Sequence, residues 1–477
     1  MPDHGEDPLN FPAKRFEDSP PSNAVIQPAS PSTPVPEGDP KPSLTQLPHR
    51  ITRRAVVGWV MYDLANTIFT MGVISLYFPL WVRETVGAER ADSVFGVIVA
   101  ISMGIIFFAS PLLGAMTDRA RRRMPFLVVS TLICVALTLV LGRAGFYFSA
   151  LCFIVANVAY QAGLQFYDAL LPEVSTEENR GRIGGIGVGI GYFGSYLAIG
   201  IGLLFQDASK PTLFSIIGIS FLVFSIPCMI FVRERGNPNP RPINFGMILN
   251  STRETIRTLR SSGQYPGLLR FLIGRVLYTD PINTVIQVMA LYTVNVAIHS
   301  GLSGDEGEKR AKVILLSAVT FAVVGGFFWG WLTDRLGPKR TLNLVLKSWM
   351  GIFVFASCIG WFGWPLWTMY LLAALAGFAL GGVWAADRPY MLRLTPPSRI
   401  GEFYGLYGMV GRFSAVTGPV LWALGTSLMI RVFHVPALKA QATTLLALLG
   451  LMVLSYVILQ PVSDERRQWS ESDRGVS

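Results

Sequence analysis

Four ionisable residues lie inside long apolar stretches of this sequence: Asp63, Arg275, Asp280 and Arg412. A charge is costly to bury in such surroundings, so an ionisable group there is a functional candidate by default. A carboxylate away from water can carry a proton or hold a cationic group, and a guanidinium can hold a carboxylate through two parallel hydrogen bonds. These residues therefore predict proton transfer or recognition of a small charged ligand. Structural pairing with a neighbouring helix is the alternative.

Polar side chains recur at helical spacing on three of these stretches, so each set shares one face of a helix. The sets are Asp63, Asn66 and Thr70; Asp280, Asn283 and Gln287; and Asn157, Gln161, Gln165 and Asp168. We expect these faces, together with Tyr278, to line a ligand pathway. The region around Trp384 is apolar, which predicts an asymmetric site for a ligand with a polar head and an apolar part. Hydrogen bonding between helices, at under about 1 kcal/mol per contact, is the alternative for the third set.

No other set of reactive side chains stands out. The four cysteines lie in apolar stretches without a CxxC pair, and the four histidines lie in the tail or in loops without ligand spacing. We therefore expect no metal, no cofactor and no enzymatic activity. The string Gly189-x-Gly191-x-x-Gly194 matches the dinucleotide-binding pattern. It lies inside an apolar stretch, however, whereas that motif needs a strand before it and a helix after it.

The stretches that carry these residues indicate the class of protein. Of the 477 residues, 51% are apolar and only 15% are charged, against about a quarter charged in soluble domains. Twelve apolar runs are long enough to cross the roughly 30 Å core of a bilayer as helices. They are residues 55–82, 91–116, 124–145, 148–171, 183–206, 211–232, 268–297, 311–333, 340–361, 365–388, 401–430 and 438–461. The sequence predicts an all-α membrane protein embedded in a lipid bilayer.

The positions of the basic residues predict how the spans are oriented. With the N-terminus in the cytoplasm, the inner loops and span ends hold 25 Lys and Arg residues and the outer loops hold nine. Because basic residues accumulate on the cytoplasmic side, both termini are predicted to be cytoplasmic, in a multi-pass protein of the cell membrane. The net charge of +10 is spread over short clusters between spans, which argues against nucleic acid as a partner.

The chain also contains a duplication. Asp63-Leu-Ala-Asn66-Thr67 returns 217 residues later as Asp280-Pro-Ile-Asn283-Thr284, and Arg182-Ile-Gly184 returns as Arg399-Ile-Gly401 at the same offset. Two six-helix halves are therefore expected at residues 51–235 and 268–462. The linker 236–267 contains a candidate amphipathic surface helix at 243–261. Residues 1–50, with twelve prolines, are expected to be a disordered tail, and residues 463–477 a second tail.

A third repeated string carries charges at the ends of spans. Gly114-x-x-x-Asp118-Arg119-x-x-x-Arg123 returns as Gly330-x-x-x-Asp334-Arg335, followed by Arg340. This string resembles the signature loop of the major facilitator superfamily, which implies a fold of two six-helix bundles. The resemblance places Asp118 near the helix start around Gly401, where the partial positive charge favours a carboxylate, and places Asp334 near Ile183. Such contacts would form a cytoplasmic gate, whereas fixing topology alone is the alternative role.

Further strings are similar to one family within that superfamily. They are Gly58–Asn66, Phe166–Glu173, Leu277–Gln287 and Arg388–Gly405. Together they resemble the vacuole-effluxer-like family, whose best-known members export amino acids from the fungal vacuole. Asp168, Asp387 and Arg388, in or next to these strings, are added to the expected gate. At Trp384 and Asp387 the sequence departs from the family pattern, which usually has Gln and then Ser-Arg-Ser.

These inferences combine into one expected function. We expect a monomeric secondary active transporter that works by alternating access and exports a small polar or zwitterionic metabolite, such as an amino acid, with coupling to protons. Drug-type export of amphipathic compounds is a second hypothesis, suggested by the apolar surroundings of Trp384. A non-transporting membrane sensor or scaffold, with the N-terminal tail as its partner-binding segment, is a third.

Overall fold

The computed structural model describes residues 51–237, 240, 242, 265–465 and 467–469. These residues form helices and loops, and no strand is assigned among them. The expected tail at 1–50 and the expected amphipathic helix at 243–261 lie outside the described residues.

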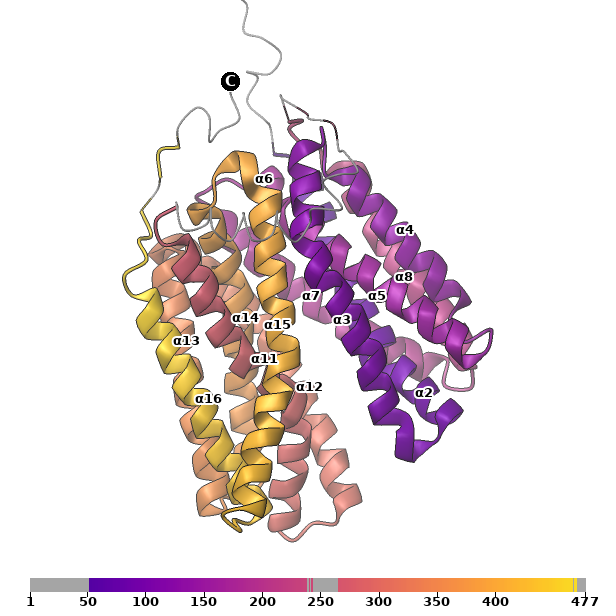
Figure 1. Cartoon of the computed structure of the whole chain (residues 1–477), viewed down its shortest axis with the longest axis vertical. Coiled ribbons are helices and arrows are strands. Elements are labelled where there is room, and N and C mark those ends of the chain that lie inside the picture. Colours follow the sequence, from indigo (N-terminus) through magenta and orange to yellow (C-terminus); the bar gives the residue numbers. More distant parts are fainter. Residues whose placement is uncertain (1–50, 238–239, 241, 243–264, 466, 470–477) are drawn as a thin grey trace, which may run out of the picture. The chain divides into compact units, whose positions relative to one another are not determined.

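Six long helical segments make up the first half of the described chain (Figure 1). The first consists of α1 (Arg53–Phe69), the π-helical η2 (Thr70–Tyr77) and α2 (Phe78–Val86). The others are α3 (Ala88–Arg119), α4 (Met124–Val140), α5 (Phe146–Asp168), α7 (Arg180–Leu204) and α8 (Lys210–Phe231), with the short α6 (Leu171–Val174) after α5. The π-helical turn was not predicted, although such segments are frequent at functional sites.

The second half repeats this pattern with six further long helices. They are α11 (Leu268–His299), α12 (Gly304–Leu336), α13 (Pro338–Phe362), α14 (Trp367–Leu394), α15 (Ile400–Arg431) and α16 (Ala437–Leu459), and the 3-10 turn η3 (Pro397–Arg399) precedes α15. Ten segments of the described chain are long and apolar enough to cross a membrane; α4 is a shorter apolar helix, and in α15 the apolar part is Val420–Arg431. The predicted all-α membrane fold is confirmed.

Two pairs of consecutive helices are each connected by a single glycine. Gly87 alone separates α2 from α3, and Gly337 alone separates α12 from α13. Their φ angles are +86° and +85°, a region that side-chain-bearing residues rarely adopt. The antiparallel packing of these helix pairs therefore depends on the absence of a Cβ at two positions.

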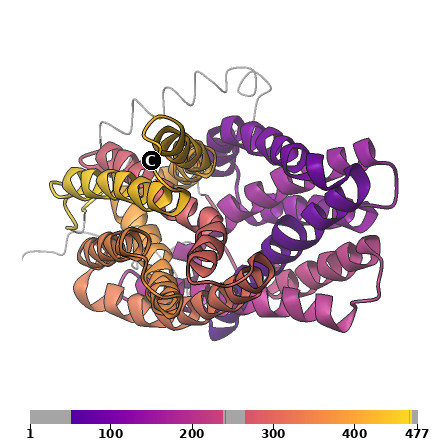
Figure 2. The same ribbon diagram turned by 90° about the horizontal axis from the view of Figure 1, so that it is seen from below.

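The helices pack in two groups. Apart from α3 and α7, helices α1 to α8 pack mainly against one another, and most contacts of α11 to α16 lie within that set; Figure 2 shows the two groups side by side. Contacts between them run chiefly along α3 with α15 and along α7 with α12. Large apolar side chains remain exposed on the outside, including Phe108 at 69% and Leu204 at 81%. Such a surface suits contact with lipid.

Candidate functional site

The first charged contact between the two groups of helices lies where α3 ends and α15 begins. We call this end of the helices the Asp118 end. Asp118 accepts hydrogen bonds of 2.7 Å from the backbone N–H groups of both Gly401 and Glu402. These N–H groups belong to the first turn of α15, whose partial positive charge stabilises a carboxylate. Arg123 lies 3.0 Å from Asp118, and Arg119 is half-buried beside it. The structure thus places Asp118 where the sequence predicts.

The second charged contact repeats the first across the duplication. Asp334, near the end of α12, accepts a 3.1 Å hydrogen bond from the backbone N–H of Arg182 in the first turn of α7. The repeat is incomplete in its basic residues. Arg340 is exposed, and the guanidinium of Arg335 lies 4.3 Å from the ring centroid of Trp331. Neither arginine forms an ion pair with Asp334 among the described residues.

Glycines allow the helices to approach each other at both contacts. A Cβ added to Gly114 would lie 2.1 Å from the carbonyl oxygen of Gly401. On the other side, a Cβ on Gly185 would lie 2.3 Å from the carbonyl oxygen of Gly326, and one on Gly330 would lie 2.8 Å from the Cα of Gly185. These distances are too short for a side chain, so the small size of Gly114 and Gly330, both predicted as gate residues, permits the close packing of the helices.

Two acids that the sequence analysis missed brace the loops behind these contacts. Glu234, just after α8, accepts hydrogen bonds from the backbone N–H groups of Arg123, at 2.6 Å, and Met124. Asp464, just after α16, accepts from Arg393 at 2.8 Å and from the Lys339 N–H at 3.3 Å. Burial raises the pKa of both carboxyls above their ordinary values, although these hydrogen bonds oppose the rise. Glu234 and Asp464 each follow the last span of one half of the chain. This shared position was the signal from which the sequence analysis could have identified them.

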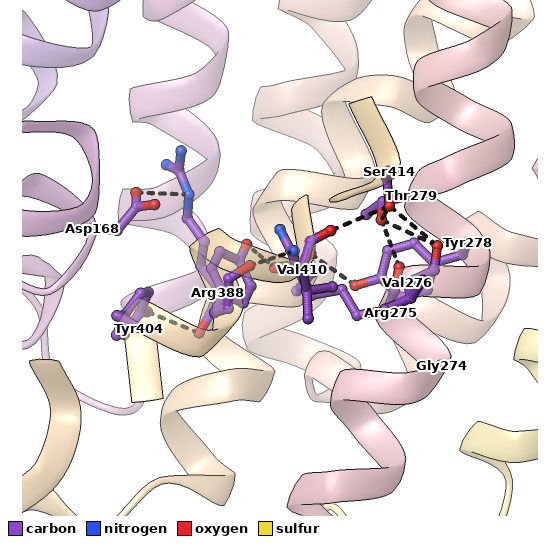
Figure 3. A network of polar contacts seen from close by, with 12 residues as sticks. Asp168, Gly274, Arg275, Val276, Tyr278, Thr279, Arg388, Tyr404, Val410 and Ser414 are labelled. Carbon is purple, nitrogen blue, oxygen red and sulfur yellow. Dashed lines mark hydrogen bonds and ion pairs between the residues drawn. The ribbon is translucent and has the colours of Figure 1, made fainter. Parts of the chain in front are cut away.

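An ion pair joins the two groups at a buried position. Oδ1 of Asp168, the last residue of α5, lies 3.2 Å from Nε of Arg388 on α14 (Figure 3). The Arg388 guanidinium also lies 5.9 Å from the ring centroid of Tyr167, and its backbone carbonyl accepts a 3.4 Å hydrogen bond from Tyr404. Asp168 and Arg388, which were predicted as gate residues, therefore contact each other across the two groups.

Asp387 has a different environment from Arg388, although the two are adjacent. Its Oδ2 lies 3.1 Å from Nε of Arg275 and accepts a 2.7 Å hydrogen bond from Tyr278, and Tyr407 donates to its Oδ1. Asp387 is 0% exposed and Arg275 2% exposed. These partners belong to α11 and α15, and Asp387 itself is on α14, so all of them lie in the same group of helices. We therefore assign Asp387 to the core of the C-terminal group rather than to the gate, and Arg275 and Tyr278 to that core rather than to a ligand pathway.

Arg412 is a buried cation of another kind. Its side chain on α15 is 6% exposed and donates to the Ser110 hydroxyl on α3 and, at 2.8 Å, to the backbone oxygen of Gln161 on α5. Both acceptors are neutral and both belong to the N-terminal group. Among the described residues no carboxylate pairs with Arg412, and its Nε has no hydrogen-bond partner. Arg412 is therefore a positive charge between the two groups without an ion pair among the described residues, although it interacts electrostatically with Asp168.

The predicted polar face of α1 is buried and only partly satisfied. Asp63 is 8% exposed and Asn66 3% exposed. Neither the amide nitrogen nor the amide oxygen of Asn66 has a hydrogen-bond partner among the described residues, which is rare for a buried group. Asp63 packs against α7, because a Cβ on Gly191 would lie 3.0 Å from its Oδ2. Thr70 is instead engaged with Tyr160 at 2.6 Å.

The matching face of α11 has different surroundings. Asp280 is 4% exposed, its Oδ1 accepts a 2.5 Å hydrogen bond from Thr417, and its Oδ2 has no hydrogen-bond partner in the described part of the chain. Asn283 is half-buried and Gln287 is exposed. The two faces correspond in sequence but not in environment.

Two side chains of the polar stripe of α5 join it to a neighbouring helix. Asn157 donates to the Ser102 hydroxyl and Gln165 donates to the Ser110 carbonyl, each at 2.9 Å. Both acceptors are on α3, so these two side chains follow the alternative given for the stripe. Trp384 is half-buried, with the Arg275 guanidinium 5.9 Å from its ring centroid. Within the described residues, no group of three or more His, Cys, Asp or Glu side chains could hold a metal ion.

Comparison with known proteins decides the family. Residues 84–466 match the family described as vacuole effluxer Atg22 like. The chain belongs to that family. This Atg22-like chain is 26% identical to a Bacillus subtilis protein described as the uncharacterized MFS-type transporter YxiO, over 85% of the chain and 94% of the relative. It is 23% identical to autophagy-related protein 22 of Eremothecium gossypii, over 79% of the chain and 86% of that protein.

Solved structures share the fold of the Atg22-like chain. The human organic anion transporter MFSD10 superposes with a TM-score of 0.64 at 17% identity, covering 86% of this chain and 99% of that one. A bacterial homologue of the iron transporter ferroportin gives the same TM-score of 0.64 at 15% identity, covering 86% and 98%. These structures show the fold, and the family match together with the MFS-type relative identifies the chain as a multi-pass membrane transporter of the major facilitator type.

Proposed function

We propose that this Atg22-like transporter exports a small metabolite that carries a carboxylate, such as an amino acid. The observation that supports the proposal is the charge of Arg412, whose partners Ser110 and Gln161 are neutral and lie on the opposite group of helices. A substrate carboxylate would supply the direct ion-pair partner that Arg412 lacks and could bind through two parallel hydrogen bonds. Arg275, the other candidate, already has a carboxylate partner in Asp387.

The N-terminal group offers a place for the opposite pole of a zwitterion. Asp63 is an acid that a substrate ammonium could approach, and Asn66 holds an unsatisfied donor and an unsatisfied acceptor one turn along the same helix. A buried amide without partners is costly, and a polar substrate would relieve that cost. We assign the amino end of the substrate to these two residues and the carboxylate end to Arg412.

Alternating access would follow from breaking the contacts between the groups. In this proposal both termini are cytoplasmic, as the distribution of basic residues predicts. The protein lies in the cell membrane, and its Asp118 end faces the cytoplasm. Opening there would separate Asp118 from Gly401, Asp334 from Arg182 and Asp168 from Arg388. It would also release the Arg412 donors for the substrate. Export is favoured by the family's description as effluxers, and coupling to protons would drive it.

Arg412→Gln tests the substrate assignment. The full-length protein in proteoliposomes is offered each of the common amino acids in radiolabelled form, and thermal stabilisation by the same compounds is measured. Hydrogen bonds to a charged group contribute about 1.5–3 kcal/mol, so the variant should lose about 10- to 150-fold in affinity. Arg412→Lys should recover little, because an ammonium cannot form the two parallel hydrogen bonds.

The matched control is Arg431→Gln, which changes an exposed arginine at the far end of the same helix. It should transport like the wild type. Amino-acid methyl esters, which lack the carboxylate, should neither stabilise the protein nor compete. Unchanged affinity in Arg412→Gln, together with broad competition by lipophilic cations, would instead support drug-type export.

A further inference from the structure

The buried acids of the described spans differ in how their charge is balanced. Asp387 pairs with Arg275, and Asp168 pairs with Arg388. Asp63 has no ion pair but interacts electrostatically with Arg388. Asp280 forms no ion pair, and its carboxyl accepts a hydrogen bond from the Thr417 side chain. Among these acids, Asp280 is the one whose described surroundings provide no balancing cation.

The hydrogen bonds at Asp280 need one more proton than a carboxylate and a threonine provide. The Thr417 hydroxyl has a single proton and two acceptors, Asp280 Oδ1 at 2.5 Å and the backbone oxygen of Phe413 at 3.1 Å. A carboxyl that carries a proton could donate to Thr417, which would then donate to Phe413, and both contacts would be satisfied. The carboxyl would also be neutral, which removes most of the cost of burying it at 4% exposure.

The charged groups on the neighbouring helices are engaged elsewhere or lie far along the helices. On α15, Arg412 binds the N-terminal group, and on α14, Asp387 pairs with Arg275 of α11 itself. On α13, Lys347 lies over the ring of Tyr456 on α16. The remaining charged side chains that the structure describes on α12 and α16 lie near the helix ends: Glu306, Glu308, Lys309, Arg310, Lys312, Asp334 and Arg335 on α12, and Lys439 on α16.

We propose that Asp280 binds the coupling proton of this transporter, and that Asp63, its counterpart in the duplication, serves the substrate instead. The inference rests on the proposed function for its transport step. The proton adds to a carboxyl oxygen of Asp280 from water on one side of the membrane and leaves to water on the other, with no change of oxidation state.

The position of Asp280 links protonation to both the gate and the substrate, because Asp280 contacts the helix that carries residues of both. Thr417 lies on α15, five residues after Arg412. The same helix begins at Gly401 and Glu402, which bind Asp118. Loss of the proton would place an unbalanced carboxylate against α15 in a medium of low dielectric constant. The cost of that charge would favour a rearrangement of the one helix that carries both Arg412 and the gate contact.

Infrared difference spectroscopy of the full-length protein in lipid, between acidic and alkaline buffer, tests the site without any substrate. Other carboxyls whose pKa is raised by burial, such as Glu234 and Asp464, also contribute C=O bands. The site is therefore identified by one band that is present in the wild type and in Asp63→Asn and missing from Asp280→Asn. Thr417→Val should shift the band, because the carboxyl loses its hydrogen-bond partner. Asp280→Glu, which keeps a titratable group, should retain a band at an altered frequency. An Asp280→Asn spectrum with the same set of C=O bands as the wild type would overturn the proposal.

The transport measurement separates this inference from the proposed function. Asp280→Asn should still exchange labelled for unlabelled amino acid but fail to accumulate it against a pH gradient. Accumulation driven by a sodium gradient, or normal pH-driven accumulation in Asp280→Asn, would overturn the assignment of the proton to Asp280. If the wild type carries no amino acid while the infrared result holds, the proposed substrate is wrong and the proton site stands.

Discussion

Gly185→Ala is expected to slow transport strongly. The added Cβ would lie 2.3 Å from the carbonyl oxygen of Gly326 and 2.6 Å from the Cα of Gly330. An ordinary carbon–oxygen contact of this kind is about 3.4 Å, so α7 and α12 would have to separate by roughly 1 Å. The closed arrangement is penalised, whereas an arrangement in which the groups have separated is not. The equilibrium therefore shifts toward the open state, and a transport cycle that must pass through both states slows accordingly.

The neighbouring Gly184→Ala is the matched control. A Cβ on Gly184 meets nothing within 4 Å, although the residue lies on the same helix one position away. Both changes raise helix propensity by about 1 kcal/mol, so the difference between them isolates the contact with α12. Gly114→Ala and Gly104→Ala form a second pair on α3, because the first would meet Gly401 and the second would meet nothing.

Spin labels at Thr176 and Arg335 report on the opening. Both positions are exposed, and they lie on opposite groups of helices near the Asp334 contact. The label distance should lengthen and uptake should fall in Gly185→Ala, and both should match the wild type in Gly184→Ala. Wild-type values for both measurements in Gly185→Ala would mean that this seam does not need to close during transport.

The fold could be predicted because its determinants are local. A run of about 20 apolar residues specifies a membrane helix wherever it lies in the sequence. Because the chain contains a duplication, the fold expected for the first half is also expected for the second. The Asp118 contact was also within reach, because the repeated string resembles the signature loop of the major facilitator superfamily, and that resemblance places Asp118 near the helix start around Gly401. The π-helical η2 was missed, since its residues Thr70–Tyr77 carry no pattern that separates them from an ordinary helix.

The pairing of the buried charges could not be predicted. Arg275 and Asp387 are 112 residues apart in sequence. Whether two such side chains meet depends on the rotation of three helices about their own axes, which the sequence does not specify. Helical spacing shows that Asn157 and Gln165 share a face, but it does not show whether that face meets a ligand or α3. Adjacent residues can also have different roles: Asp387 pairs within its own group, whereas Arg388 pairs across to the other.

Asp387→Ala is expected to destabilise the protein by about 3–5 kcal/mol, the usual cost of breaking a buried ion pair from one side. The variant leaves Arg275 as an uncompensated charge at 2% exposure and removes the acceptor of the Tyr278 and Tyr407 hydroxyls. Unfolding by denaturant in detergent micelles measures the loss. An isolated surface acid would cost less than about 1 kcal/mol by the same measurement, so the two cases are well separated.

Removing the partners as well should restore most of this stability. Arg275→Met with Asp387→Leu takes both charges out of the core, and such replacements are often neutral or stabilising. Tyr278→Phe and Tyr407→Phe would then remove the two hydroxyls left without an acceptor, each worth about 1–3 kcal/mol when unsatisfied. The coupling energy from this cycle decides where Asp387 belongs. A core residue gives large coupling with Arg275 and leaves the label distance between Thr176 and Arg335 unchanged. A gate residue would change that distance while leaving unfolding almost unaffected, which would contradict our assignment of Asp387 to the core.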